Sequence, residues 1–125
     1  MKDEIVIAQA LEGQVRIHAA RSTGMVEEAR KAHYLMPTSL AALGRMMTVT
    51  SILASDLKKG GEKITSIING HGPSGTILVQ AKGNGDVRGF IGDPNLYMVK
   101  EDGHLDVGGA VGTNGTLTVI RDLGL

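Results

Sequence analysis

A long apolar segment, TSLAALGRMMTVTSILASDLKK at residues 38–59, constrains the fold of this chain more than any other feature. Its large apolar residues recur mostly at steps of three or four, as in a helix: Leu40, Leu43, Met47, Leu53 and Leu57. Between residues 40 and 54 it is apolar nearly all round, so other elements must cover it. A membrane span needs about 20 mostly apolar residues, and Arg45 and several hydroxyl groups interrupt this segment. We therefore expect a central core helix, ended by Gly60-Gly61.

Two strands and a short helix precede this segment. EIVIAQALEGQVRIHAA alternates around Glu12-Gly13, which predicts two strands joined by a turn. STGMVEEARKAHYL changes to a helical period, and Pro37 blocks its continuation. Ser22 or Thr23 can cap this helix, and Glu27 and Glu28 favour its first turn. Arg30, Lys31 and His33 favour its last turn, and Val26, Ala29 and His33 share one face.

From Glu62 onward the sequence predicts strands and turns. KITSIIN, TILVQAK, DVRGFIG and TLTVIRDL favour strands, and Asn-Gly pairs at residues 69–70, 84–85 and 114–115 favour turns. The predicted fold is α+β, a mainly antiparallel sheet with a helical pair inserted after the first two strands. The apolar strand that stops at Leu125 would leave an exposed edge. We expect the chain to continue as a larger domain, and we expect homodimers formed by edge pairing or strand exchange.

Composition excludes several classes of function. The 125 residues fit one domain, with 42% apolar and 21% charged residues, and the only aromatics are Tyr34, Phe90 and Tyr97. Thirteen basic and 13 acidic residues remove the electrostatic argument for nucleic acid or membrane partners. The absence of cysteine excludes disulfides, cysteine-zinc sites and thiol catalysis within this chain. MKDEIVIAQ lacks the features of a secretory signal, so we expect a cytoplasmic protein.

Two glycine-rich segments resemble phosphate-binding loops. Gly70–Gly75 spells G-x-G-x-x-G, but a β-rich run follows it and Pro73 lacks an N–H group, so we interpret it as a hairpin connection. Gly108–Gly115 lacks the Lys-Ser/Thr pair of a P-loop and is followed by a strand. A close approach between backbones explains its glycines better. The alternative function is a small anion- or nucleotide-binding β module that uses either turn.

The remaining candidates form no catalytic, cofactor-binding or metal-binding set, so we expect a protein that is not an enzyme. The histidines lack metal-ligand spacing, and no serine lies in a G-x-S-x-G elbow. We expect the loop acids to be solvated and Arg45 to be structural, with its charge in solvent or paired with a carboxylate. These candidates are His18, His33, His71 and His104; Ser39, Ser51 and Ser74; and Glu101, Asp102 and Asp106.

Five segments in order carry a family resemblance: GQVRIHAARST, VEEARKAH, PTSLAALGRMMT, NGHGPSGTILVQAKGNGDVRGFIGDP and LDVGGAVGTNGTLTVIRDLGL. From about Gly13 to Leu125 the chain resembles the heat shock protein 33 family, the redox-regulated bacterial chaperones also called 33 kDa chaperonins. The resemblance implies an ATP-independent holdase that captures unfolding proteins during oxidative and heat stress. Residues 1–125 would be a single, incomplete N-terminal domain.

The resemblance also implies parts that this sequence does not contain. A linker and a C-terminal zinc domain, with four cysteines in C-x-C and C-x-x-C pairs, control the family's activity. No cysteine occurs here, so no zinc or redox residue is assigned. Flexible methionines suit promiscuous apolar contacts, but we expect core filling for Met25, Met36, Met46, Met47 and Met98. The client-binding residues stay unassigned.

Overall fold

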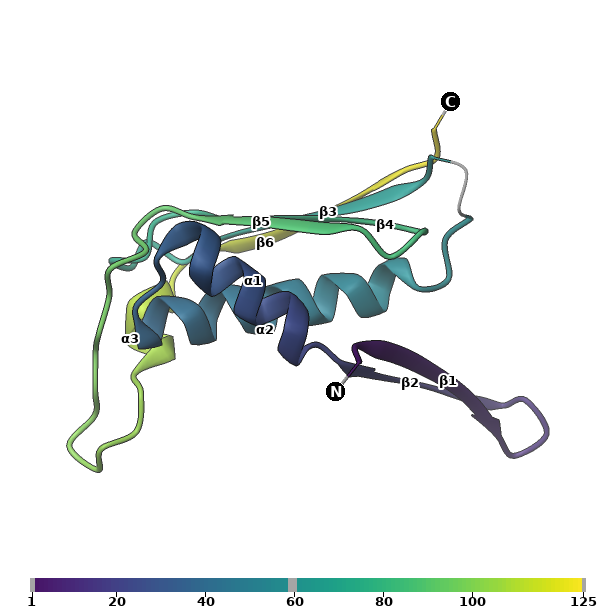
Figure 1. Ribbon diagram of the computed structural model, residues 1–125, viewed down its shortest axis with the longest axis horizontal. Coiled ribbons are helices and arrows are strands. Elements are labelled where there is room, and N and C mark those ends of the chain that lie inside the picture. The colour runs from purple at the N-terminus through teal and green to yellow at the C-terminus, as the bar shows by residue number, and fades with distance from the viewer. Residues whose placement is uncertain (1, 59–60, 125) are drawn as a thin grey trace.

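The computed structural model describes residues 2–58 and 61–124 and has the predicted α+β architecture (Figure 1). Both longer helices follow the first two strands, and every strand pairs antiparallel to its neighbours. The elements in chain order are β1 (Glu4–Ala10), β2 (Val15–Arg21), α1 (Thr23–His33), α2 (Pro37–Ala54), β3 (Lys63–Asn69), β4 (Ile77–Lys82), β5 (Val87–Ile91), α3 (Val107–Val111) and β6 (Thr116–Asp122).

The strands form two sheets where the sequence predicted one. β3 to β6 make a four-stranded sheet in the order β5-β4-β3-β6, while β1 and β2 form a separate hairpin. The hairpin extends away from the rest of the molecule (Figure 1). Its strands pair along their full length, from Glu4↔Arg21 to Ala10↔Val15. Because α1 begins at Thr23, directly after β2, the chain turns away before the hairpin can join the larger sheet.

The core lies between α2 and the four-stranded sheet. Ile77, Val79 and Ala81 alternate with more exposed residues along β4, so one face of this strand is buried. Leu43 and Met47 of α2 pack against that face in the same cluster. The period of two in the strands and the helical period in α2 therefore meet at one interface, as the sequence patterns predict.

Helix α2 is shorter and less covered than predicted. It ends at Ala54, and the Ser55 hydroxyl donates a hydrogen bond to the Ile52 carbonyl at 2.6 Å just beyond its end. Leu53 is 46% exposed, because the sheet, α1 and α3 leave one flank of the helix open. Gly60 of the predicted stop lies outside the described residues. Among the described residues, no helix is long and apolar enough to cross a membrane.

Helix α1 differs from its predicted capping pattern. The Ser22 hydroxyl lies 2.7 Å from the Thr48 hydroxyl, and the Asp3 carboxylate accepts hydrogen bonds from the first α1 amides instead. Glu27 and Glu28 lie beyond the first turn, whereas the basic last turn is confirmed. On the predicted face, Ala29 is buried and Val26 half-buried, but His33 is exposed because the helix ends there and turns into solvent.

Helix α3 was not predicted, because its sequence VGGAV is short and rich in glycine. Asp106 caps it by accepting a hydrogen bond from the Gly109 amide at 3.0 Å. Ala110 is fully buried on its inner side. A single cap and one buried residue fix this turn of helix, and neither produces a periodic pattern.

Candidate functional site

The two glycine-rich segments meet, and their backbones pack together. Gly72 and Ser74 donate amide hydrogen bonds to the Val111 and Ala110 carbonyls at 3.1 and 2.8 Å. A Cβ atom added at Gly72 would lie 2.5 Å from the Ala110 carbonyl oxygen, and one at Gly70 would overlap the Val111 carbonyl. The predicted close approach between backbones is confirmed. These amides donate to protein carbonyls, so they are not available to the phosphate of the alternative hypothesis.

The histidines lie apart from one another and serve local structure. His71 Nδ1 lies 2.6 Å from the Asn114 carbonyl and so joins the two glycine-rich segments. His104 Nδ1 lies 3.1 Å from the Asp102 carboxylate in an exposed loop, and His33 is exposed. His18 lies beside α2. In the described part of the chain, no three histidine, aspartate or glutamate side chains gather as a metal site would require.

The serines and loop acids also hold structure. Ser39 donates to the Asp93 carbonyl at 2.7 Å and accepts from the Leu96 amide, which fastens the 93–96 loop to α2. Ser51 donates to the Thr48 carbonyl and Ser74 to the Gly75 carbonyl. Glu101 and Asp102 are solvated, as predicted, whereas Asp106 is half-buried because its carboxylate caps α3. Hydrogen bonds from the His104 amide and side chain hold the pKa of Asp102 below its usual range.

Arg45 and the methionines divide between surface and core. Arg45 is exposed on α2 and makes no ion pair with another described residue, in agreement with the solvent alternative for its charge. Met47 is buried, and Met25 and Met46 pack against the same core cluster. Met98 is half-buried. The expected core role is wrong for Met36, which is 41% exposed because it lies in the link just before α2.

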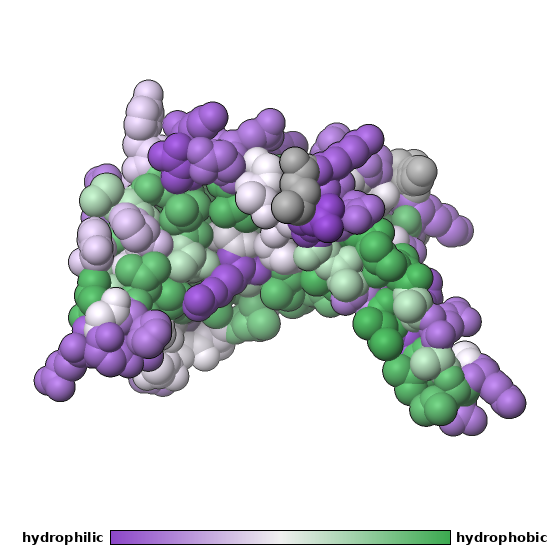
Figure 2. All heavy atoms as spheres, turned by 60° about the horizontal axis from the view of Figure 1, so that its bottom comes forward, coloured by the Kyte–Doolittle hydropathy of each residue, from purple (hydrophilic) through white to green (hydrophobic). Residues whose placement is uncertain are grey.

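The β1–β2 hairpin presents an apolar face that no part of the described structure covers. Facing residues of its strands pair directly, so alternate pairs share one side. We name this side the outer hairpin face. Its six apolar residues are all exposed: Val6, Ala8, Ala10, Val15, Ile17 and Ala19. The charged pair Glu4↔Arg21 lies on the same side, at the end of the strands. Figure 2 shows hydrophobic residues along the projecting hairpin. The alternation in the sequence could have revealed this face, but it does not tell which side of a strand is covered.

A second apolar area lies on the helix side of the four-stranded sheet. Leu117 and Val119 of β6 lie opposite Ile68 and Ser66, which face α2, yet they are 59% and 49% exposed. Helix α2 lies mainly over β4, β5 and β3. Contiguous exposed apolar surface is typical of sites that bind other proteins.

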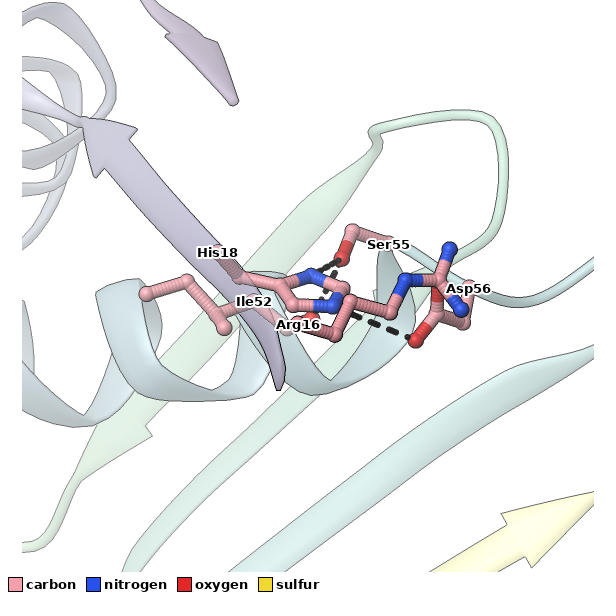
Figure 3. A network of polar contacts seen from close by, with 5 residues as sticks. All are labelled: Arg16, His18, Ile52, Ser55 and Asp56. Atoms are coloured by element: carbon pink, nitrogen blue, oxygen red, sulfur yellow. Dashed lines mark hydrogen bonds and ion pairs between the residues drawn. The ribbon is translucent and has the colours of Figure 1, made fainter. Parts of the chain in front are cut away.

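The hairpin is attached to the molecule chiefly by polar contacts (Figure 3). His18 Nδ1 lies 2.8 Å from Ser55 Oγ, and its Nε2 lies 3.5 Å from Asp56 Oδ2. Arg16 forms an ion pair with the other carboxylate oxygen of Asp56 at 2.9 Å. At the opposite end of the hairpin, Asp3 accepts the α1 amides described above. Neither hydrophobic core cluster of the described chain includes a hairpin residue.

Comparison with known proteins identifies the family. The pattern of the Hsp33 protein family matches residues 3–124, which is nearly all of the chain. The chain belongs to the Hsp33 family. It is 46% identical over 125 residues to the 33 kDa chaperonin of Staphylococcus carnosus and 48% identical over 124 residues to that of Bacillus subtilis. These alignments cover 99% and 98% of this chain but 42% of each relative.

A solved structure agrees with this assignment. The crystal structure of the 33 kDa chaperonin from Thermotoga maritima matches with a TM-score of 0.89 at 34% identity, over 97% of this chain and 41% of that one. The resemblance predicted from the five sequence segments is therefore confirmed. The family is one of chaperones and not of enzymes.

The residues of this chain do not fit the zinc centre that the family resemblance implies. Such a centre needs four cysteine ligands, and the chain has no cysteine. The described histidines and acids provide no substitute cluster. We therefore derive no metal-dependent step for this chain.

Proposed function

We propose that this chain is the client-binding part of an ATP-independent holdase, which binds unfolding proteins in the bacterial cytoplasm and prevents their aggregation during oxidative and heat stress. The outer hairpin face is the observation that carries the proposal. The redox switch and its zinc would lie in residues that this chain lacks. Residues 1–125 would form an incomplete N-terminal domain, and its client-binding residues would include Val6, Val15 and Ile17.

The chemistry of the hairpin suits an unfolded client. An unfolding protein offers apolar side chains together with backbone groups that have lost their partners. The outer hairpin face can bury the side chains, at about 25 cal/mol for each Å² of apolar surface. The free edges of a two-stranded sheet can pair with an extended backbone segment. Neither interaction requires a fixed client sequence, and this promiscuity is what a holdase needs.

Light scattering tests the proposal. A chemically unfolded client is diluted with and without the chain, under reducing conditions and without ATP. We expect the chain to suppress scattering and Ile17→Ser to suppress it less. Phe90→Ser on β5 is the control, because Phe90 is 55% exposed, close to the 51% of Ile17, and lies neither on the hairpin nor on β6. Equal loss of suppression in both variants, or no suppression by the native chain at a severalfold excess, would contradict the proposal.

The full-length protein needs the same pair of variants, because this chain spans about 42% of its relatives. We expect Ile17→Ser to weaken client capture by the activated full-length protein as well. Normal capture by that variant would show that other residues provide the surface there, and would remove the outer hairpin face from the proposal.

We also propose that the chain forms homodimers through β6. This strand lies at the edge of the four-stranded sheet, and all seven of its residues are exposed. Antiparallel pairing of two copies about Val119 would place Arg121 opposite Leu117 and Asp122 opposite Thr116, so no like charges meet. Sedimentation should show dimers that Val119→Lys separates and Val119→Thr preserves. A monomer at high concentration would contradict this proposal, and slow exchange of subunits would indicate strand exchange.

A further inference from the structure

A cleft of about 820 Å³ lies between the hairpin and the rest of the molecule. The hairpin forms one wall, and α1, the end of α2 and the turn between β4 and β5 form the others. The apolar residues of the lining come from both sides: Ile5, Ile7 and Ala20 from the hairpin, and Met25 and Val87 from α1 and β5. These hairpin residues lie on the side opposite to the outer hairpin face. The cleft is thus a separate apolar site.

The hairpin wall of this cleft is fixed at two places. Asp3 accepts hydrogen bonds of 2.9 and 2.7 Å from the Gly24 and Met25 amides at one end of the hairpin. His18 and Arg16 contact Ser55 and Asp56 further along β2 (Figure 3). A wall held by a few polar contacts can shift more readily than one held by core packing. Such a wall can adjust to side chains of different size.

The cleft carries more negative than positive groups. Asp3, Glu4, Glu28 and Asp86 line it, against Arg21 and Lys82. The chain as a whole has 13 acidic and 13 basic residues, so this excess is local. Arg21 lies 3.6 Å from Glu4, which offsets its charge. The cleft therefore favours a ligand with positive charge beside its apolar groups.

We propose that this cleft binds extended segments of client proteins in which lysine or arginine lies next to apolar side chains. The proposal rests on the proposed holdase function and names a class of client segment for a second site. The apolar side chains contact Ile5, Ile7 and Val87, and the cationic groups lie at Glu28 and Asp86. The outer hairpin face is apolar along most of its length, and its one charged pair, Glu4 and Arg21, is mutually neutralised, so this face binds apolar segments with little regard to their charge.

Binding of three labelled peptides to the native chain tests the proposal. The first has an apolar centre with lysine flanks, the second has the same centre with glutamate flanks, and the third keeps the lysines around a serine-glycine centre. Fluorescence anisotropy at low salt should show tightest binding for the first peptide. Added salt should weaken binding of the first peptide and should not weaken binding of the second, because salt screens the attraction between the lysines and the acidic groups. Equal binding of the first two peptides would overturn the proposal.

Substitutions locate the site. Glu28→Gln with Asp86→Asn should weaken binding of the first peptide about fivefold and should not weaken binding of the second, because it removes repulsion from the glutamate flanks. The control, Glu101→Gln with Asp102→Asn, removes two exposed loop acids outside the cleft and should change neither. Equal weakening by both double variants would mean general attraction to acidic surface and would overturn the proposal. Light scattering separates this proposal from the proposed function. If the chain suppresses client aggregation but the peptides show no charge preference, only the cleft proposal is refuted. If the chain does not suppress aggregation, the holdase function is refuted.

Discussion

The four-stranded sheet with α2 and the β1–β2 hairpin are both antiparallel and rich in Ile and Val, yet they differ in what holds them. The sheet buries Ile77 and Val79 against Leu43 of α2. The hairpin has exposed residues along the whole of β1 and is fastened by Asp3 and His18. Strands of similar composition thus stabilise the fold where a helix packs on them. They provide exposed binding surface where no other element covers them.

The largest expected effect is in the core of the sheet region. Leu43 is fully buried, so Leu43→Ala should lower the free energy of unfolding by about 3 kcal/mol. Leu53→Ala, at a 46% exposed position of the same helix, should change it by about 0.5 kcal/mol or less. Urea unfolding measures both. Similar effects of the two substitutions would mean that α2 is not packed on the sheet as described.

The next effect concerns the contact between the two glycine-rich segments, Gly70–Gly75 and Gly108–Gly115. Gly70→Ala would force a methyl group into the Val111 and Gly112 carbonyls, which are backbone atoms and cannot rotate away. We expect a loss of about 2 kcal/mol in the free energy of unfolding. Gly108→Ala is the control, because no atom lies within 4 Å of its added Cβ. A tolerated Gly70→Ala would show that the two backbones are further apart.

A smaller effect should show that the hairpin opens more easily than the four-stranded sheet. Asp3→Ala removes the acceptor for two α1 amides, a capping loss of about 1 kcal/mol. Amide hydrogen exchange in β1 and β2 should accelerate while exchange in β3 and β4 stays slow. Glu101→Ala, in an exposed loop, should change neither. Equal acceleration in both sheets would show that the hairpin opens only with the whole molecule.

The smallest effect is a pH dependence on α1. Hydrogen bonds from Arg30, at 2.6 and 2.8 Å, hold the pKa of Glu27 below its usual range. A lowered carboxyl pKa stabilises the fold above the ordinary value, and that contribution disappears as the pH falls through the lowered value. Carboxyl NMR titration should show Glu27 titrating at higher pH in Arg30→Gln. An unchanged titration of Glu27 in Arg30→Gln would rule out the ion pair between Glu27 and Arg30.

The sequence predicts most of the elements because their patterns are local. β3 matches KITSIIN residue for residue, and the hairpin connection predicted at Gly70–Gly75 joins the antiparallel strands β3 and β4. The split into two sheets was not predictable, since alternation identifies a strand and not its partner. The cap from Asp3 to Gly24 joins residues 21 apart, so no capping pattern could show it. The residues of the outer hairpin face alternate along the sequence as in a strand with one buried side. Only the fold shows that no other element covers this side.

Hydrogen exchange with and without an unfolded client tests the central claim most directly, because it reports the hairpin and the sheet in one experiment. We predict that client binding slows exchange in residues 4–21 and leaves β3 and β4 unchanged. Protection confined to α2 and β6, with the hairpin unaffected, would contradict the assignment of client binding to the hairpin.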